Sequence, residues 1–182
     1  MPRYVVLLRG INVGGKNTLS MAKLKAALEE LGYENVATYI NSGNVVLDSK
    51  KSATAIEDEI ETALPRQFKL DSKLIRVLAL SKATYKKMVG GRPKGFGDEP
   101  GKYHSDAIFL MRGLKLEDAV GAFDPREGVD AFWPGKSVIY HRRLSAQRTK
   151  SKLNKMLGTP HYKSMTIRNW ATTMKLVEML DA

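Results

Sequence analysis

The chain of 182 residues contains no cysteine, and this absence excludes several kinds of chemistry. Disulfide bonds, zinc–thiolate sites and thiol nucleophiles all require cysteine. Histidine is also scarce, because His104, His141 and His161 are the only ones and they are scattered without a metal-ligand spacing. We therefore expect no metal site and no cofactor.

Long apolar runs are missing as well. The N-terminal run Tyr4–Leu8 is shorter than the roughly 7–15 apolar residues of a signal-peptide core. No other stretch approaches the ~20 apolar residues that a membrane span requires. Together with the lack of cysteine, this favours a cytoplasmic protein that has no membrane partner.

Acidic residues are absent from the whole segment between Ala131 and Val177. The net charge of the chain is +11, and ten of these charges lie in this segment. A region with charge of one sign concentrates anions through its field. The alternative is a solvated basic surface without a partner. We favour a ligand because solvated surfaces usually mix both signs. The basic residues of the segment are Lys136, Arg142, Arg143, Arg148, Lys150, Lys152, Lys155, Lys163, Arg168 and Lys175.

The apolar periodicity of the first 80 residues predicts the element order βαββαβ. A capping box at Thr54 and Glu57 should start the second helix, and Pro65 should kink or end it. This order is the split-βαβ pattern of a ferredoxin-like domain. The predicted elements are strand Tyr4–Leu8, helix Ser20–Leu31, strands Val36–Ile40 and Val45–Leu47, the helix after Thr54, and strand Leu74–Leu80.

The second half of the chain begins in a similar way. The runs VVLLRG and AIFLMRG resemble each other, as do the two hairpins that follow, although chance similarity is the alternative for segments this short. A short helix at Lys82–Val89 and the Gly- and Pro-rich stretch GGRPKGFGDEPGK separate the halves. The predicted later elements are strand Asp106–Arg112, helix Leu116–Phe123, strands Val129–Phe132 and Ser137–His141, and helices Thr149–Leu157 and Thr166–Leu180.

These patterns predict an α+β protein of two tandem ferredoxin-like subdomains with antiparallel sheets and additional C-terminal helices. The first subdomain should span residues 1–80 and carry a Gly-rich loop. Residues 81–104 should form the helix and linker, and residues 105–182 the second subdomain with the basic C-terminal helices.

The Gly-rich loop is the stretch RGINVGGKNT, residues 9–18. It nearly matches the phosphate-binding motif G-x-x-x-x-G-K-[ST], but Asn17 stands at the last position. Nucleotide triphosphatases also need a parallel sheet and a metal-binding acid at a strand end, and neither is predicted here. The glycines can still form an anion nest of backbone N–H groups, with charge from Lys16 and Arg9.

Topology predicts that this loop meets the hairpin turn. In βαββαβ the first two strands run the same way, so the first strand ends at the edge of the sheet where the hairpin turns. One polar pocket could then be lined by Asn12, Asn17, Asn41, Ser42 and Asn44. The alternative is that each Asn and Gly serves only the geometry of its turn.

The basic C-terminal segment offers a second candidate site. The sequences RTKSK and TIRNW open the two predicted helices, and helix N-termini attract anions. Thr149, Ser151 and Thr166 could equally be simple caps. Trp170 is interpreted as a core residue. The candidate ligand-binding residues from both regions are Arg9, Gly10, Asn12, Gly14, Gly15, Lys16, Asn41, Ser42, Gly43, Asn44, Arg148, Lys150, Lys152, Arg168 and Asn169.

Three motifs, RGINVGG, YINSGNV and TIRNW, resemble a family of small bacterial proteins designated domain of unknown function 1697. The resemblance runs over nearly the whole chain. It implies two tandem ferredoxin-like subdomains, and it implies no activity because none is established for the family. The residues that carry it are Arg9, Gly10, Asn12, Gly14, Gly15, Asn41, Ser42, Gly43, Asn44, Arg168, Asn169 and Trp170.

Three functions remain open, and an anion-binding module for nucleic acid or another phosphorylated ligand is the favoured one. Against RNA, strand Val45–Leu47 lacks the aromatic residues that stack bases. The second is an enzyme for a small phosphorylated or acyl-phosphate substrate, with Lys16 and Arg9 stabilising charge and Asn41 or Asn44 orienting the nucleophile. It lacks an evident general base. The third is a protein-interaction domain.

Overall fold

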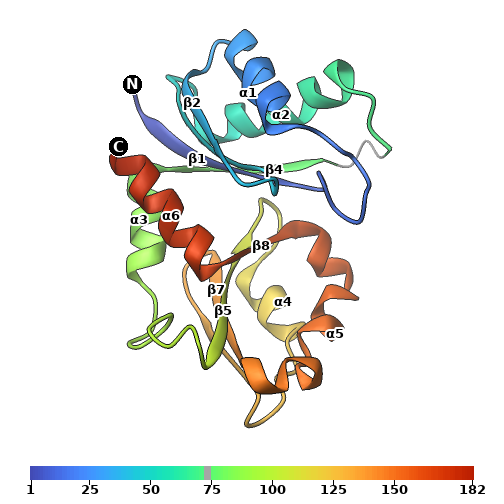
Figure 1. Ribbon diagram of the computed structural model, residues 1–182, viewed down its shortest axis with the longest axis vertical. Helices are drawn as coiled ribbons and strands as arrows, with labels where there is room; N and C mark the ends of the chain where they lie inside the picture. Colours follow the sequence, from blue (N-terminus) through green and yellow to red (C-terminus); the bar gives the residue numbers. More distant parts are fainter. Residues whose placement is uncertain (72–74) are drawn as a thin grey trace. The chain divides into compact units, whose positions relative to one another are not determined.

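The computed structural model describes residues 1–71 and 75–182 and divides into two units (Figure 1). The first unit contains Met1–Lys86 and Leu176–Ala182, and the second contains Lys87–Lys175. The division therefore falls inside two helices, α3 (Lys82–Gly90) and α6 (Trp170–Asp181).

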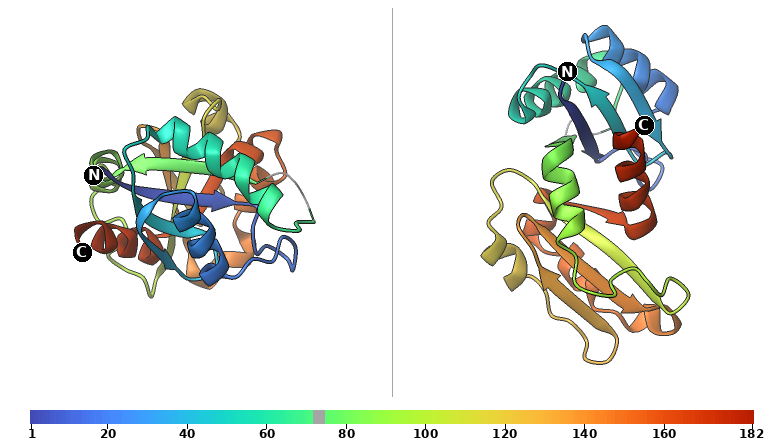
Figure 2. Two further views of the ribbon diagram at one scale, coloured as in Figure 1. Left: turned by 90° about the horizontal axis from the view of Figure 1, so that it is seen from above. Right: turned by 90° about the vertical axis from the view of Figure 1, so that its left-hand side faces the viewer.

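The first unit has a four-stranded antiparallel sheet in the order β2-β3-β1-β4. Helices α1 (Met21–Glu30) and α2 (Ala53–Gln67) cover one face of it (Figure 2), where Leu24, Leu28, Ile56 and Ile60 join its apolar core. The strands alternate between this face and the opposite one, as a period of two requires. The strands are β1 (Arg3–Arg9), β2 (Glu34–Tyr39), β3 (Asn44–Asp48) and β4 (Arg76–Ser81).

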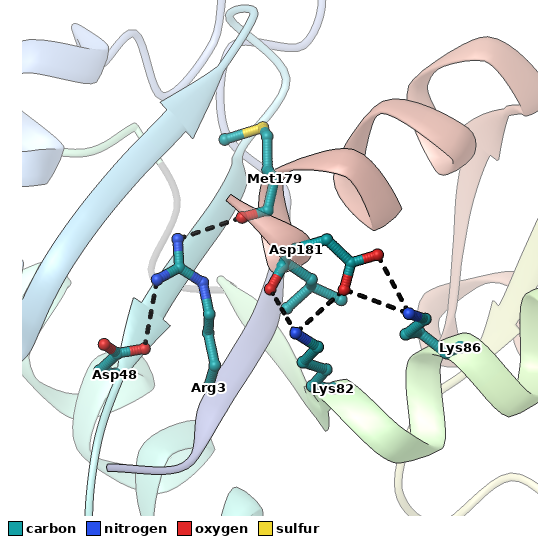
Figure 3. A network of polar contacts seen from close by, with 7 residues as sticks. Arg3, Asp48, Lys82, Lys86, Met179 and Asp181 are labelled. Carbon is teal, nitrogen blue, oxygen red and sulfur yellow. Dashed lines mark hydrogen bonds and ion pairs between the residues drawn. The ribbon is translucent and has the colours of Figure 1, made fainter.

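Polar contacts attach the end of α6 to the first unit (Figure 3). The guanidinium of Arg3 donates to the carbonyl of Met179 at 3.1 Å and lies 3.7 Å from the Asp48 carboxylate. Lys82 donates to the carbonyl of Leu180 at 2.9 Å. Lys82 and Lys86 also pair with the carboxylate of Asp181, at 2.9 and 3.0 Å. The last residues of the chain are thus part of the first unit although the rest of α6 is not.

The second unit has a four-stranded antiparallel sheet in the matching order β6-β7-β5-β8. Helices α4 (Leu116–Gly121) and α5 (Leu153–Leu157) pack on one face of it. Two 3₁₀ segments, η1 (Ser145–Lys150) and η2 (Pro160–Ser164), flank α5. The strands are β5 (Tyr103–Leu110), β6 (Asp130–Pro134), β7 (Val138–Leu144) and β8 (Met165–Asn169).

The prediction of an α+β protein with two antiparallel sheets is confirmed. The two halves also share a detail at the hairpin. The N–H of Leu8 donates to the carbonyl of Gly43 at 2.8 Å, and that of Leu110 donates to the carbonyl of Ser137 at 3.0 Å. Gly43 and Ser137 both have positive φ, 76° and 60°. The similarity between the two hairpins is therefore also present in their backbone geometry.

Both predicted C-terminal helices are wrong in part. The helix predicted over Thr166–Leu180 starts only at Trp170, because the preceding residues form β8 and pair with β5. The helix predicted over Thr149–Leu157 is split, since Ser151 is extended between η1 and α5. There the Ser151 hydroxyl and the Lys152 N–H donate to the Asp130 carboxylate, at 2.5 and 2.9 Å. Long-range bonds override the local helical pattern in both segments.

The predicted start of α2 is also wrong. Ser52, not Thr54, is the N-cap, and its hydroxyl accepts the N–H of Ala55 at 3.2 Å. Glu57 is buried and accepts the N–H of Ala79 on β4 at 3.0 Å, so it does not complete a capping box. The helix continues past Pro65 to Gln67. Leu74, the predicted first residue of the next strand, lies outside the described residues.

Candidate functional site

The Gly-rich loop and the hairpin turn of the first unit are in contact. The amide nitrogen of Asn12 donates to the carbonyls of Leu19 and Asn41, both at 2.8 Å. The side-chain oxygen of Asn12 accepts the N–H of Leu19 at 2.7 Å. Asn12 itself has a φ of 51°, which asparagine tolerates better than most residues. This one side chain therefore closes the loop and joins it to the turn.

Asn17 and Asn44 are also committed to the backbone. Asn17 is buried, and its amide donates to the carbonyl of Gly10 at 2.7 Å. The backbone N–H of Asn17 donates to the carboxylate of Asp71 at 2.7 Å. This backbone N–H is therefore already bound to an anionic group of the chain itself. The amide of Asn44 donates to the carbonyl of Tyr39 and to the hydroxyl of Ser42. The asparagines hold the loop and the turn together rather than presenting amides to a ligand.

The tip of the loop is open. Gly14 and Gly15 have φ values of 56° and 74°, and a side chain added at either would meet nothing within 4 Å. Lys16 is exposed beside them. Arg9 and Gly10 at the end of β1 are half-buried, Asn41 and Ser42 are exposed, and Gly43 is buried against Leu8. The loop can offer its backbone N–H groups and the positive charge of Lys16 to an anion.

The basic C-terminal residues belong to the second unit and differ in their surroundings. Arg148 and Lys150 are exposed on η1, whereas Lys152 pairs with Asp124 at 2.9 Å. Arg168 is buried on β8 and donates to the Thr166 hydroxyl and the Ile167 carbonyl, each at 2.9 Å. Asn169 caps α6 by accepting the N–H of Thr172 at 2.8 Å. The expectation that Arg168 opens a helix is thus wrong.

Sequence reasoning missed a group of aromatic and basic residues on one face of the second sheet. The guanidinium of Arg142 lies 4.0 Å from the ring centroid of Tyr103 and 5.2 Å from that of Trp133. Lys102 lies 5.1 Å from the Tyr103 ring. We call these four residues, Lys102, Tyr103, Trp133 and Arg142, the basic–aromatic face.

Strand register creates this face. Arg142 on β7 pairs directly with Ser105 on β5 and with Ala131 on β6. Tyr103 and Trp133 lie two residues along those neighbouring strands, so both rings are diagonal to Arg142 and within reach of it. The side chains stand on the face opposite the core residues Ile108 and Ile139. The only local sequence signal is the alternation within each strand, which does not reveal the register.

A charged cluster lies at the other face, near the start of β5. His104 Nε2 is 3.3 Å from Asp106 Oδ1, and His141 Nε2 is 3.4 Å from Asp130 Oδ1. Burial raises the pKa of Asp106, against the opposing influence of His104 and Arg143. Burial lowers the pKa of His141 to about 4, against the attraction of Asp130. His141 is therefore a neutral, buried imidazole at physiological pH.

A cavity of ≈ 390 Å³ adjoins this cluster. Its walls come from the Gly- and Pro-rich stretch, the start of β5 and the start of α6. His104 and Asn169 are among its polar residues, and Tyr103 and Trp170 are among its aromatic ones. Trp170 is half-buried and packs edge to face on the buried Phe96 at 5.0 Å, so it lies at the edge of the cavity and is not a fully buried core residue.

Residues 1–71 and 75–182 contain no group of three or more histidine, aspartate or glutamate residues that could hold a metal ion. The same residues include no helix of sufficient length and apolar character to cross a membrane.

Comparison with known proteins identifies relatives without a described activity. A family model described as "Protein of unknown function (DUF1697)" matches residues 1–140. The structure of conserved bacterial protein SP0830 from Streptococcus pneumoniae is similar to this chain, with 30% sequence identity and a TM-score of 0.82. The similarity covers 98% of each of the two chains and therefore includes both units. The comparison with curated proteins found no match.

Proposed function

The chain belongs to the DUF1697 family, and from this starting point we propose that it binds single-stranded nucleic acid on the basic–aromatic face. The observation that carries the proposal is the guanidinium of Arg142 between the rings of Tyr103 and Trp133. Proteins that bind single strands combine a positively charged surface with aromatic rings on which bases stack.

The charge of the surrounding segment supports this ligand class. The segment from Ala131 to Val177 has ten basic residues and no acidic one. Contacts between such residues and phosphates supply most of the non-specific affinity for nucleic acid. The aromatic residues that the first sheet lacks on Val45–Leu47 are present on β5 and β6 of the second sheet. The lack of base-stacking aromatic residues on Val45–Leu47 therefore does not argue against nucleic-acid binding by the second sheet.

The Gly-rich loop supports the proposal less well than this face does. One of its amides is bound by Asp71, and its asparagines are bonded to the backbone. The enzyme alternative, with catalysis of acyl-phosphate or phosphate chemistry at this loop, is disfavoured for the same reason. Arg9, Lys16 and the exposed glycines remain proposed as secondary contacts for a phosphate.

The experiment is fluorescence anisotropy of a short labelled single-stranded oligonucleotide over a series of salt concentrations. We expect a dissociation constant in the range of about 10⁻⁴–10⁻⁶ M at physiological salt. Tyr103→Ala should weaken binding roughly 5- to 150-fold if one base stacks there. Arg142→Ala should also lower the slope of log affinity against log salt by about 0.7, the value of one lost phosphate contact.

Arg66→Ala is the matched control, because Arg66 is an exposed arginine on α2 and lies in the other unit. Affinity that is independent of salt, or equal losses in the Arg142 and Arg66 variants, would refute nucleic-acid binding at this face. A partner protein that is retained in a pulldown after nuclease treatment would instead support the protein-interaction alternative.

Two finer expectations also remain proposals. The element order βαββαβ with strand order β2-β3-β1-β4 supports a ferredoxin-like topology for the first unit, and the order β6-β7-β5-β8 supports it for the second. The absence of cysteine supports a cytoplasmic location.

A further inference from the structure

The cavity beside β5 is lined in part by Tyr103, which also belongs to the basic–aromatic face. Its other lining residues are different from those of that face. It lies between the segment around Gly97, the start of β5 and the start of α6. Its volume of ≈ 390 Å³ falls within the ~300–1,000 Å³ that is usual for small-molecule sites. The cavity is therefore large enough for one small molecule or for one residue of a polymer.

One wall of the cavity is the indole ring of Trp170, which neighbouring residues contact on two sides. A Cβ atom added at Gly97 would lie 2.2 Å from Cδ1 and 2.4 Å from Nε1 of Trp170, so the backbone at this glycine is in contact with the ring. Phe96 packs edge to face against the same ring, and Arg92 lies 5.7 Å from its centroid. A ring held in this way can stack on a planar heterocycle without first becoming ordered. Tyr103 supplies a second aromatic surface.

The polar wall contains groups that can hold a phosphate. Nε2 of His104 faces the buried carboxylate of Asp106, so Nδ1 is the nitrogen left to hydrogen-bond with a bound molecule. The side chain of His104 is 33% exposed, whereas that of Asp106 is 5% exposed.

Asn169 completes this wall. Its side-chain oxygen accepts the N–H of Thr172, and its NH₂ group can therefore donate to a ligand. It lies at the N-terminal end of α6, where the helix dipole favours negative charge.

We infer that this cavity binds one nucleoside monophosphate unit, with the heterocycle on Trp170 and Tyr103 and the phosphate near His104 and Asn169. The inference rests on the proposed function for its ligand class. The unit is either a free mononucleotide or the phosphorylated end of a strand, since the two present the same groups. Asp106 keeps the imidazole of His104 oriented toward that phosphate.

The test is a titration of ¹⁵N-labelled full-length protein with AMP, followed by the indole N–H signal of Trp170. The chain has two tryptophans, so Trp133→Phe assigns the signal. We expect a saturable shift with AMP and at least tenfold weaker binding of adenosine. His104→Ala and Gly97→Ala should each weaken AMP binding at least tenfold. His161→Ala, which removes a histidine on η2 outside the cavity, should leave the affinity for AMP unchanged.

No saturable shift of the Trp170 signal, or equal AMP affinities in the His104 and His161 variants, overturns the inference. The two ligand sources are separated by anisotropy of one oligonucleotide with and without a 5′-phosphate. Tighter binding of the phosphorylated strand that disappears in His104→Ala supports the strand end as the ligand. Equal binding of both strands, with AMP affinity still dependent on His104, supports the free nucleotide.

The same measurements distinguish this inference from the proposed function. If AMP fails to bind while Arg142→Ala still weakens strand binding, only the cavity inference is overturned. If AMP binds through His104 while Arg142→Ala leaves strand affinity unchanged, the strand-binding face is overturned and the cavity remains.

Discussion

Replacing Gly43 with alanine should destabilise the first unit far more than the same change at Gly14. Both glycines have positive φ, 76° and 56°. The difference is in their surroundings. A Cβ at Gly43 would lie 2.8 Å from the Cβ of Leu8 and 3.1 Å from its carbonyl oxygen, whereas a Cβ at Gly14 would meet nothing within 4 Å. The pair of variants therefore separates backbone strain from close packing.

The magnitude follows from two contributions. An L-residue in the left-handed region costs about 1–2 kcal/mol relative to glycine, and this applies to both variants. Overpacking adds about 1–3 kcal/mol, and this applies only to Gly43→Ala, because the atoms it would displace are a strand backbone and a buried Cβ. We expect a loss of about 1–2 kcal/mol for Gly14→Ala and about 2–5 kcal/mol for Gly43→Ala.

Urea denaturation followed by far-UV circular dichroism measures the loss. With a slope of about 2 kcal/mol/M, the midpoint of Gly43→Ala should fall by about 1–2.5 M. The exchange of the Leu8 amide gives a local measurement, because its N–H donates to the carbonyl of Gly43 at 2.8 Å. Faster exchange should be confined to Gly43→Ala. Equal midpoints for the two variants would refute the claim that the turn is packed against the end of β1.

Four further predictions concern stability. Ser52→Ala should lower the free energy of unfolding by about 1 kcal/mol, because it removes the N-cap of α2, whereas Thr54→Ala should leave the urea midpoint nearly unchanged. Since burial lowers the pKa of His141 to about 4, the unfolded chain takes up this proton first as the pH falls. Stability should therefore be lost from about pH 6.5 down to pH 4, by up to about 3 kcal/mol, and His141→Phe should remove that loss in urea midpoints compared at neutral and acidic pH. Arg3→Met should cost about 1–2 kcal/mol by leaving the Met179 carbonyl and Asp48 without their partner, and thermal denaturation measures it. Asp181→Asn should leave the melting temperature unchanged, because its pairs with Lys82 and Lys86 are exposed.

The candidate site was predictable only in part. The order of the elements predicts that the Gly-rich loop contacts the hairpin turn. The hydrogen bond from the Asn12 side chain to the carbonyl of Asn41 is this contact. The role of the asparagines was open, because an amide can serve a ligand or its own backbone equally well. The pairing of Asn17 with Asp71 was not predictable, since these residues are far apart in the chain. The basic–aromatic face was missed for the same reason.

Local sequence patterns were sufficient to predict the helices and strands whose conformation is determined by their own residues. The apolar periodicity of residues 4–64 determines β1, α1, β2, β3 and the core face of α2, and the duplicated order determines two antiparallel sheets. The predicted family is confirmed by the family model that matches residues 1–140. The absence of acidic residues between Ala131 and Val177 is likewise a property of the sequence alone.

Tertiary structure decided what depends on partners distant in sequence. Residues 165–169 become a strand because β5 supplies the hydrogen bonds, although their local pattern continues a helix. Ser151 interrupts a predicted helix because Asp130 accepts its hydroxyl and the next N–H. Arg142 meets Tyr103 and Trp133 only because the register of three strands brings them to one face. In each case the energy of a long-range contact exceeds the small difference between local backbone states, and that contact cannot be read from neighbouring residues.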